Sequence, residues 1–390
     1  MISAALLERV ACPVCLVPAG CPSCAATTSS HEACTARYAG RVRCPCGGPD
    51  KVRLVRDGES LACPCCRASY ALHPELGYAD LLPPATVGDT THYADHEFQE
   101  RLRVTDAPPV FSARVKADMM LRMLAPAPGE VVLDLGCGAG KLALFAGTDG
   151  ARPAGLDVAP FFLPRAAREV DLVLGDLRRL PFRKATFPRA YSLDVLEHLD
   201  EPGVREVLVE ARRTVGPDGR LFVYTHAMES SRIAGFQRIV NRLARRLGRA
   251  GLIDHEREAM RKSDHRNAIR SHEHFEAMCA EAGLEVAERR YYNVFFKAVV
   301  EDLALRLYEQ AGRRRAGGVG RRPAAGHAEG HAHPAPGDAP PTPAPGRLAI
   351  AFALGLTWLL KLDVVILGGI RTGPFFGLLR PGRGGAAGAR

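Results

Sequence analysis

Short apolar runs alternate with amphipathic stretches between residues 111 and 292, and this alternation predicts strands connected by helices. Helices are expected over 111–126, where prolines end the pattern, and over 201–219, which closes on Gly-Pro-Asp-Gly. Because strands and helices alternate, the segment should form βαβ units around a parallel sheet. The runs expected to form buried strands are residues 131–134, 154–157, 172–174, 190–193 and 220–225.

The pattern changes after the fifth predicted strand. Residues 227–271 resemble an insertion, after which Ser271 and Gly283 are placed as the N-cap and C-cap residues of a helix. A further strand is expected over 286–292. Residues 311–346 are rich in Ala, Gly, Pro, Arg and His and offer no apolar face to bury, which predicts a disordered linker. The predicted parts are a cysteine-rich domain at 1–84, a main domain at 85–300, a helix end and linker at 301–347, and an apolar helix, last strand and tail at 348–390.

Composition adds a charge argument to this picture. The 390 residues are 47% hydrophobic and 24% charged, as in a soluble globular protein, but the net charge is +9. That charge permits an anionic partner, either nucleic acid or an anionic membrane surface, and is equally consistent with an arginine-rich genome composition. The N-terminus lacks the long apolar core and cleavage site of a secretion signal, so a cytoplasmic location is expected.

Cysteines gather at the N-terminus. Ten of the 12 lie between Cys12 and Cys66, and in a cytoplasmic protein such clusters favour metal over disulfides. The Cys-x-x-Cys pairs at each end of this region have zinc-knuckle spacing, and two such pairs make a four-thiolate site. Reduced, unligated thiols are the alternative, and Cys65 competes with Cys66. The predicted zinc ligands are Cys12, Cys15, Cys63 and Cys66, with Cys21, Cys24, Cys44 and Cys46, near Cys34, available for a second ion.

A glycine-rich turn follows the first strand of the main domain, in the stretch VVLDLGCGAG. Glycines let the backbone adopt unusual angles and admit a ligand against the main chain, and a helix N-terminus follows. The spacing is G-x-G-x-G, whereas dinucleotide folds use G-x-G-x-x-G over a pyrophosphate. Asp134, two residues before the turn, suits a cationic ligand better than a pyrophosphate.

These residues resemble the first motif of class I S-adenosylmethionine (SAM)-dependent methyltransferases. Four further blocks occur in the same order: GLDVAP, GDLRRLPF, AYSLDVLEHLDEP and EARRTVGPDGRLFVY. The resemblance implies a Rossmann-like α/β fold with a seven-stranded sheet in the order 3-2-1-4-5-7-6. It also implies that Asp157 accepts from the ribose hydroxyls, that Asp176 lies near the adenine amino group and that Leu177 lies beside the ring. The implied SAM-binding residues are Asp134, Gly136, Cys137, Gly138, Gly140, Asp157, Asp176 and Leu177.

Single residues keep other interpretations. Asp176 could serve as a helix N-cap, and Cys137 as a small filler in the turn. At the acceptor side the resemblance places Asp194 at the methyl-transfer site. His198, together with Glu197, follows the carboxyl end of the fourth strand, where open α/β sheets bind ligands, so His198 is a candidate general base. Further histidine candidates for that role are His226, His265 and His272.

The two ends of the cysteine-rich region resemble the zinc ribbon attached to some RNA methyltransferases, and the small zinc-ribbon activator that partners tRNA and protein methyltransferases. The spacer between the knuckles, with its additional cysteines, departs from that pattern.

Two segments suggest a surface for partners. Residues 231–249 form a basic amphipathic stretch that suits a membrane surface or an RNA backbone, or a lid packed on its own domain. The uninterrupted apolar run 348–360 is shorter than the ~20 residues that span a bilayer, and extending it to 370 includes Lys361 and Asp363. It either spans a membrane or packs on the domain or in an interface. In the second case residues 373–382 form the last strand, antiparallel beside the fifth.

Three functions follow from these features. The first is a SAM-dependent methyltransferase acting on a small-molecule or lipid-like acceptor, because an apolar tail suits an apolar substrate. The second is an rRNA or tRNA base methyltransferase guided by the zinc ribbon, although no NPPY-type tetrad follows the fourth strand. The third is a non-catalytic adaptor with a methyltransferase fold, against which the intact acids of the SAM site argue.

Overall fold

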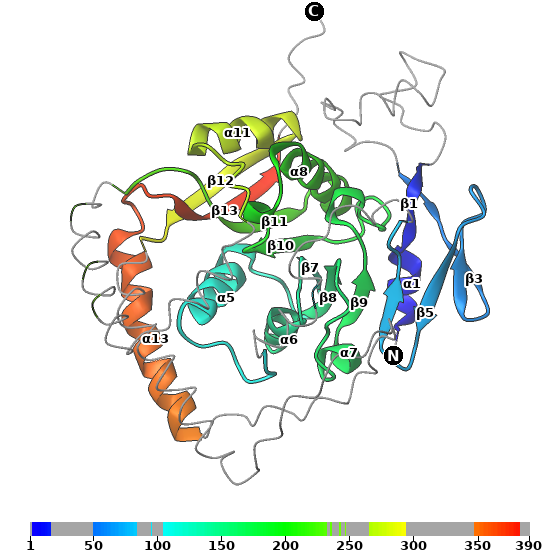
Figure 1. Ribbon diagram of the computed structural model, residues 1–390, viewed down its shortest axis with the longest axis horizontal. Coiled ribbons are helices and arrows are strands. Elements are labelled where there is room, and N and C mark those ends of the chain that lie inside the picture. Colours follow the sequence, from blue (N-terminus) through cyan, green and yellow to red (C-terminus); the bar gives the residue numbers. More distant parts are fainter. Residues whose placement is uncertain are drawn as a thin grey trace, which may run out of the picture.

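The computed structural model describes residues 2–16, 50–83, 95, 104–231, 235, 242, 246, 265–293 and 347–382. A mixed sheet of eleven strands runs through the molecule in the order β12-β13-β11-β10-β7-β8-β9-β6-β5-β4-β3 (Figure 1). Its main-domain strands are β7 (Val131–Leu135), β8 (Arg152–Asp157), β9 (Asp171–Leu174), β10 (Arg189–Leu193), β11 (Arg220–His226), β12 (Leu284–Tyr291) and β13 (Pro374–Pro381).

The five strands from β7 to β11 are parallel, and all five begin and end within two residues of the expected positions. The chain fills the sheet outward from β7 through β8 to β9, then returns to place β10 on the other side of β7. Open α/β sheets bind ligands at the carboxyl ends of strands beside such a reversal. Strand β13 lies antiparallel between β11 and β12, so residues 373–382 do contain a strand beside the fifth one.

Helices cover both faces of the sheet. They are α5 (Phe111–Leu124), α6 (Lys141–Gly147), α7 (Ala166–Glu169), α8 (Glu201–Val215), α11 (His272–Glu281) and α13 (Arg347–Leu367), with short 3-10 turns η3 (Leu177–Arg179) and η4 (Leu196–His198). Side chains alternate along β11: Leu221 and Val223 join the core under α8 and α11, whereas Phe222 and Tyr224 join the core under α5 and α13. Ser271 caps α11 as expected, and its side chain accepts from His274 N.

The N-terminal residues add four strands to the same sheet, which therefore has more than the expected seven strands, and they also form a separate antiparallel sheet of two strands. They form α1 (Ala4–Arg9), β1 (Ala11–Leu16), β2 (Lys51–Arg53), β3 (Val55–Asp57), β4 (Ser60–Ala62), β5 (Ser69–His73) and β6 (Tyr78–Asp80). Strand β6 pairs in parallel with β9, and β5, β4 and β3 follow it antiparallel. Most of these strands have three residues, too few for an alternating pattern to stand out from the sequence.

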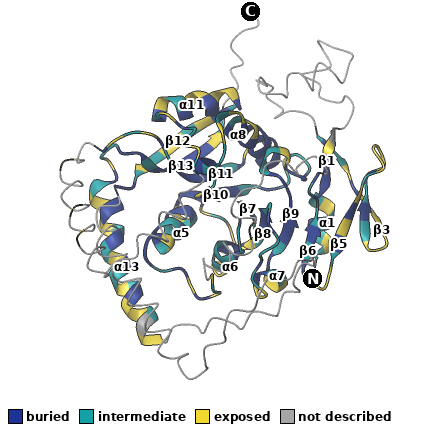
Figure 2. Ribbon diagram, viewed as in Figure 1, coloured by how far each residue is buried: buried dark blue, intermediate teal, exposed yellow. Residues whose placement is uncertain are grey.

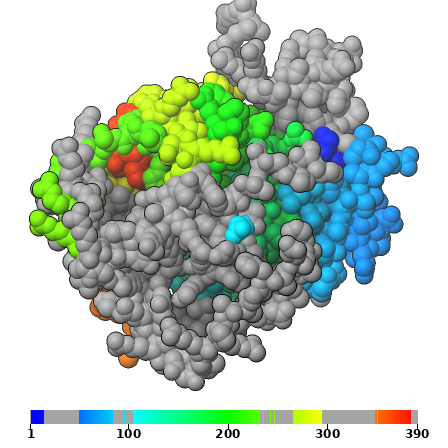
Figure 3. Space-filling view, viewed as in Figure 1, coloured from blue at the N-terminus to red at the C-terminus, as the bar shows by residue number. Residues whose placement is uncertain are grey.

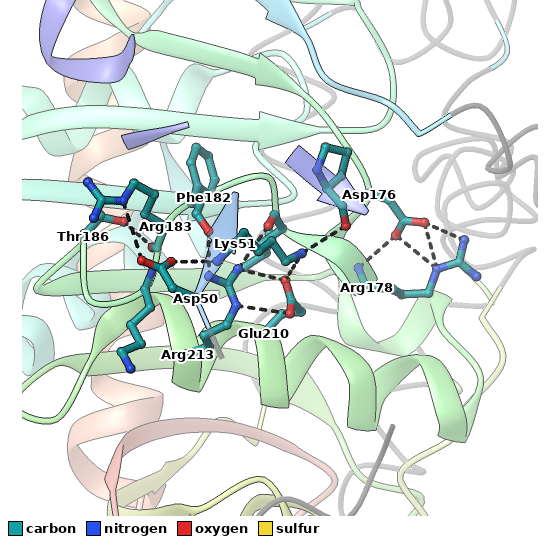
Figure 4. Close-up of polar contacts among 12 residues, drawn as sticks. Asp50, Lys51, Asp176, Arg178, Phe182, Arg183, Thr186, Glu210 and Arg213 are labelled. Atoms are coloured by element: carbon teal, nitrogen blue, oxygen red, sulfur yellow. Dashed lines mark hydrogen bonds and ion pairs between the residues drawn. The ribbon is translucent and has the colours of Figure 1, made fainter. Parts of the chain in front are cut away.

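A buried ionic cluster fixes the N-terminal strands to helix α8 (Figure 4). Lys51 Nζ donates to Glu210 Oε2 at 2.8 Å, and both side chains are 2% exposed. Arg213 donates to the same carboxylate from Nη2 at 3.0 Å and also to the carbonyl oxygens of Phe182 and Leu180. Burial, together with the charge of Arg213, lowers the pKa of Lys51 well below its ordinary value. The cluster therefore places the Lys51 and Arg213 side chains around one carboxylate in a buried position.

The long C-terminal helix α13 is docked along one side only. The amide of Phe111 at the start of α5 donates to Thr357 Oγ1 at 2.8 Å, and Lys361 pairs with Asp118 of α5 at 2.6 Å. By length and composition, residues 350–367 are the one segment of the described chain long and apolar enough to cross a membrane. Figure 2 shows α13 buried toward the domain and exposed on its outer side. The exposed apolar side chains there are Leu348, Phe352, Trp358, Leu362, Val365 and Ile366.

Helix α13 and the N-terminal strands lie on opposite sides of the molecule in Figure 1, and Figure 3 shows the N-terminal strands in blue at the surface on their side. Most of the predicted insertion 227–271 and all of the predicted linker 311–346 lie outside the described residues. So do Cys21, Cys24, Cys34, Cys44 and Cys46.

Candidate functional site

The glycine turn lies between the carboxyl end of β7 and helix α6. Gly136, Gly138 and Gly140 have φ angles of +84°, +51° and +78°, which side chains disfavour. A Cβ at Gly136 would lie 2.5 Å from Val195 Cγ2, and one at Gly140 would lie 2.7 Å from Ala166 Cβ. A Cβ at Gly138 would meet nothing within 4 Å. Two glycines thus permit close packing of the protein, whereas Gly138 presents bare backbone to open space.

Asp134 lies beneath this turn on β7. Its side chain is buried and accepts a hydrogen bond from Tyr191 Oη of β10 at 2.9 Å. Burial raises the pKa of Asp134 to about 8, although the Tyr191 hydrogen bond acts in the opposite direction. A nearby cation would stabilise the ionised carboxylate in such a position. Tyr191 was not among the residues expected at the site, because an apolar strand with one tyrosine gives no signal beyond core packing.

Asp157 ends β8 directly beside the turn. Gly138 N donates to Asp157 Oδ2 at 2.7 Å, and Ala159 N donates to Asp157 Oδ1 at 3.0 Å. Burial raises the pKa of this carboxyl, and the backbone donors partly oppose the shift. The carboxylate is therefore held against the exposed backbone of Gly138, at the carboxyl edge of the parallel strands.

Asp176 follows the next strand, β9, and here the N-cap alternative describes the observed contacts. The carboxylate accepts from Arg178 N at 2.8 Å at the start of η3, and the Arg178 guanidinium pairs with it at 2.9 Å. Leu177 is half-buried beside the core. Arg178 is a further residue at this position that the sequence did not mark, since arginines are common on such turns.

Cys137 fills space inside the turn. Its thiol is buried against Gly155 of β8, where a Cβ would lie 2.8 Å from the sulfur. Burial raises the pKa of the thiol well above its ordinary value. Because the thiolate is the reactive form, Cys137 has the character of a packing residue.

Asp194 marks the carboxyl end of β10. Its φ of +57° is unusual for a residue with a side chain, and such strain gathers at functional sites. Its carboxylate accepts from Lys116 Nζ of α5 at 2.6 Å and 2.8 Å, and that ammonium lies 4.3 Å from the centre of the Tyr224 ring. Lys116 was missed because a single lysine on an amphipathic helix normally faces solvent.

Three of the four candidate histidines come together beyond Asp194. The rings of His198 and His265 are 4.8 Å apart, and the rings of His226 and His265 are 6.3 Å apart. His226 Nδ1 lies 3.4 Å from Glu197 Oε1, and the Glu197 side chain is buried. The fourth, His272, lies elsewhere, with Nε2 2.8 Å from the Thr372 carbonyl oxygen and the ring packed on Tyr291 and Phe375.

At the far end of the sheet three cysteine sulfurs converge. The sulfurs of Cys12, Cys63 and Cys66 lie within 4.8 Å of one another, and Cys12 Sγ is 3.9 Å from Cys66 Sγ. Four thiolates at about 2.3 Å around a tetrahedral zinc ion would lie about 3.8 Å apart. The donor set and spacing fit zinc, with Cys66 rather than the neighbouring Cys65 in the group. The side chain of Cys15, the expected fourth ligand, is outside the described residues.

Comparison with known proteins gives one family match. Residues 132–219 match the family described as methyltransferase domain. Over 147 residues the chain is 35% identical to an uncharacterized 37.1 kDa protein in transposon TN4556 of Streptomyces fradiae, covering 35% of this chain and 39% of that protein. Over 101 residues it is 30% identical to a sterol 4-C-methyltransferase of Caenorhabditis elegans, covering 24% of this chain and 30% of the relative. The chain thus spans less than half the length of either relative.

Among solved structures, the phosphoethanolamine N-methyltransferase 2 of Haemonchus contortus in complex with SAM is 15% identical. The alignment covers 75% of this chain and 61% of that chain, with a TM-score of 0.44.

The parallel sheet with its glycine turn at the carboxyl edge is an α/β ligand-binding arrangement. Together with the match over residues 132–219, it identifies a methyltransferase domain of the SAM-dependent class.

Proposed function

We propose that the chain transfers a methyl group from SAM to a small-molecule or lipid-like acceptor. The observation that supports this most directly is the turn at Gly138, where bare backbone faces open space beside the carboxylates of Asp134 and Asp157. Such a turn accepts a ligand against the main chain, and buried acids next to it favour a cationic one. SAM carries an amine and a sulfonium and has no phosphate.

In this proposal the donor lies across the carboxyl ends of β7, β8 and β9. The backbone from Gly136 through Cys137 and Gly138 to Gly140 contacts SAM, and the ionised carboxylate of Asp134 faces its cationic portion. Asp157 accepts from the ribose hydroxyls. Asp176 accepts from the adenine amino group, for which it exchanges its contact with Arg178, and Leu177 packs beside the ring.

Methyl transfer from a sulfonium is an in-line displacement on an activated carbon, so the protein acts mainly by holding the acceptor in line. Asp194 and His198 are assigned to the acceptor side, because both follow the carboxyl end of β10. Val195, which lies between them in the sequence, packs closely against Gly136 of the glycine turn. Lys116 holds the Asp194 carboxylate in place. Neither role requires a proton transfer in the proposal.

An apolar acceptor is supported by the sterol C-methyltransferase among the relatives and by the outer face of α13. Lys361 and Asp363 are bound to the domain, Lys361 by Asp118 and Asp363 by the amide of Asn293, so α13 is attached along one side. We infer that its outer face lies on a membrane surface instead of crossing the bilayer. Val365→Asp should abolish cosedimentation with anionic lipid vesicles, and unchanged cosedimentation would contradict the inference.

We further propose a structural zinc ion held by Cys12, Cys63 and Cys66, with Cys15 as the fourth ligand. Thiolate coordination would supply folding free energy to a region of three-residue strands that bury little. Neighbouring cysteines provide a matched test: Cys66→Ser should lose one equivalent of zinc by elemental analysis, whereas Cys65→Ser should retain it. Equal zinc contents in the two variants would refute this ligand assignment.

Calorimetric titration with SAM tests the donor site. Gly138→Ala should weaken SAM binding at least tenfold, because its methyl group would occupy the ligand space. Gly58→Ala is the control, since Gly58 also has a positive φ (+60°) and also faces open space, far from the site on the β3–β4 turn. Absence of SAM binding to zinc-replete protein would overturn the proposed function.

The acceptor is tested by incubating the protein with methyl-labelled SAM and either a lipid and metabolite extract or total RNA. Label is expected in the extract. Label in RNA alone would overturn the choice of acceptor in favour of the RNA base methyltransferase, without affecting the donor site.

A further inference from the structure

A carboxylate and two imidazoles meet at the end of β10 in a way that the methyl donor does not require. One ligand atom each from Glu197, His198 and His265 lies within 4.8 Å of the other two. Glu197 and His198 come from η4, directly after β10, and His265 comes from a segment 67 residues further along the chain. We propose that these three side chains bind a divalent first-row transition-metal ion at the acceptor side of the methyl-transfer site.

The surroundings hold the three ligands together. Arg266 N donates to the Glu197 carbonyl oxygen at 2.8 Å, and Met228 N donates to the Ile269 carbonyl oxygen at 2.9 Å, so the backbone beside His265 is attached to both η4 and the end of β11. Thr225 Oγ1 donates to Glu197 Oε2 at 3.1 Å. Hydrogen bonds of this kind to a ligating carboxylate orient it and are typical of metal sites.

Burial differs among the ligands in a useful way. Glu197 is 2% exposed, whereas His198 and His265 are half-buried. A buried carboxylate is normally paired with a cation or coordinates a metal. An ion bound here would be coordinated by the buried carboxylate on its inner side and by the two half-buried imidazoles nearer the surface. Three protein ligands leave a fourth coordination position, on the solvent side, for another molecule. Two histidines, one carboxylate and an open position form the ligand set of catalytic zinc sites and of non-haem iron sites.

The ligand types restrict the ion. Mg²⁺ and Ca²⁺ prefer oxygen ligands, whereas imidazole favours Zn²⁺, Co²⁺, Ni²⁺ and Fe²⁺. Ligand atoms of a tetrahedral site at about 2.0–2.1 Å from the metal lie about 3.3 Å apart, so the half-buried imidazoles must close in by about 1.5 Å at most. His226, 3.4 Å from Glu197 Oε1, supports the carboxylate from outside the three-ligand group.

A metal ion at this position would restrict the chemical class of the methyl acceptor. This step rests on the proposed function: a metal with an open position binds a hydroxyl or phenol oxygen and lowers the pKa of that group. The acceptor proton leaves to solvent, the new bond forms between oxygen and the methyl carbon, and the bond from that carbon to sulfur breaks, which converts the sulfonium to a thioether. The inferred acceptors are therefore oxygen nucleophiles.

Titration of the full chain with Co²⁺ in the absence of SAM tests the site. Cobalt bound by cysteine sulfurs gives a strong sulfur-to-metal charge-transfer band, which nitrogen and oxygen ligands do not give. We therefore expect the protein with its cysteine sites filled with zinc to bind one further Co²⁺ whose visible spectrum lacks that band.

His265→Ala, at a half-buried position, should weaken this further Co²⁺ binding by about 100-fold or more, because one of three protein ligands is lost. His274→Ala is the control, since His274 is also half-buried but contacts Glu201 instead. Equal affinity in the wild-type and His265→Ala proteins, or no cobalt beyond the zinc-protected sites, would overturn the metal site. SAM binding measured on the same preparations separates this failure from a failure of the proposed function.

Discussion

Removing either partner of the buried Lys51–Glu210 pair should have very different consequences. Glu210 is the single anion between two cations, since it accepts from Lys51 at 2.8 Å and from Arg213 at 3.0 Å. Glu210→Gln leaves both cations in a buried position without their counter-charge. Lys51→Met instead leaves one anion and one cation in contact, with an apolar chain of similar length in place of the lysine.

The magnitudes follow from burial. Breaking a buried ion pair by removal of one partner typically costs about 3–5 kcal/mol, and we expect Glu210→Gln to lose that much free energy of unfolding. Lys51→Met loses a charge-assisted hydrogen bond of about 1.5–3 kcal/mol but also removes the cost of burying an ammonium group. That cost is large here, because burial lowers the pKa of Lys51 well below its ordinary value. The net loss for Lys51→Met should therefore be within about 1.5 kcal/mol.

Urea unfolding followed by far-ultraviolet circular dichroism measures both changes on the zinc-replete protein. Arg53→Met is the control, because it removes an exposed cation from the same strand β2 and should change stability by no more than about 0.5 kcal/mol. The double variant Lys51→Met/Glu210→Gln should be more stable than Glu210→Gln alone, since it removes one of the two buried cations that Glu210→Gln leaves without a counter-charge. A Lys51→Met loss equal to that of Glu210→Gln, or a Glu210→Gln loss below about 1 kcal/mol, would refute the charge-balance argument.

Further predictions concern the stability of variants at the proposed SAM site. Gly136→Ala should cost about 2–4 kcal/mol of stability in denaturant unfolding, because its Cβ would lie 2.5 Å from Val195, whereas Gly138→Ala should cost only the backbone strain of about 1–2 kcal/mol; equal losses would contradict this. Asp134 has a folded pKa of about 8, above its unfolded value, so its contribution to stability is present below about pH 4 and lost as pH rises toward 8. Relative to Asp134→Asn, the ligand-free wild-type protein should therefore lose up to about 1.4 kcal/mol per pH unit across that range, and parallel pH profiles would refute the shift.

Much of the main domain could be predicted from sequence. Its parallel strands are continuous apolar runs bounded by turns, and five motif blocks in a fixed order leave little freedom in the topology. The N-terminal strands could not be predicted in the same way. Strand β6 is a three-residue segment whose partner β9 lies more than 90 residues away, and pairing over such a distance leaves no periodic pattern in the chain.

The site was predicted unevenly for a comparable reason. The residues of the glycine turn, the acid that ends β8 and the acid that follows β9 belong to motifs, and the structure gathers them at one edge of the sheet. The side chains that hydrogen-bond to the acids of the site were not predicted. Lys116, which donates to Asp194, lies on a helix before the motifs, and Tyr191, which donates to Asp134, lies within a buried strand. His265 lies near the end of the predicted insertion, 67 residues after His198, and only the folded chain brings it next to Glu197 and His198. Tertiary proximity of this kind has no local sequence signal.

The parallel pairing of β6 with β9 has a consequence for how the chain can be divided. Without residues 50–83, the outer side of β9 would present a row of unpaired amide and carbonyl groups to solvent. Exposed strand edges of that kind recruit strands from other molecules and lead to aggregation. The N-terminal strands thus pair this side of β9 and move the free edge of the sheet to β3, which has only three residues. A shortened chain that begins at residue 104 should therefore be poorly soluble even though every proposed SAM-binding residue is retained.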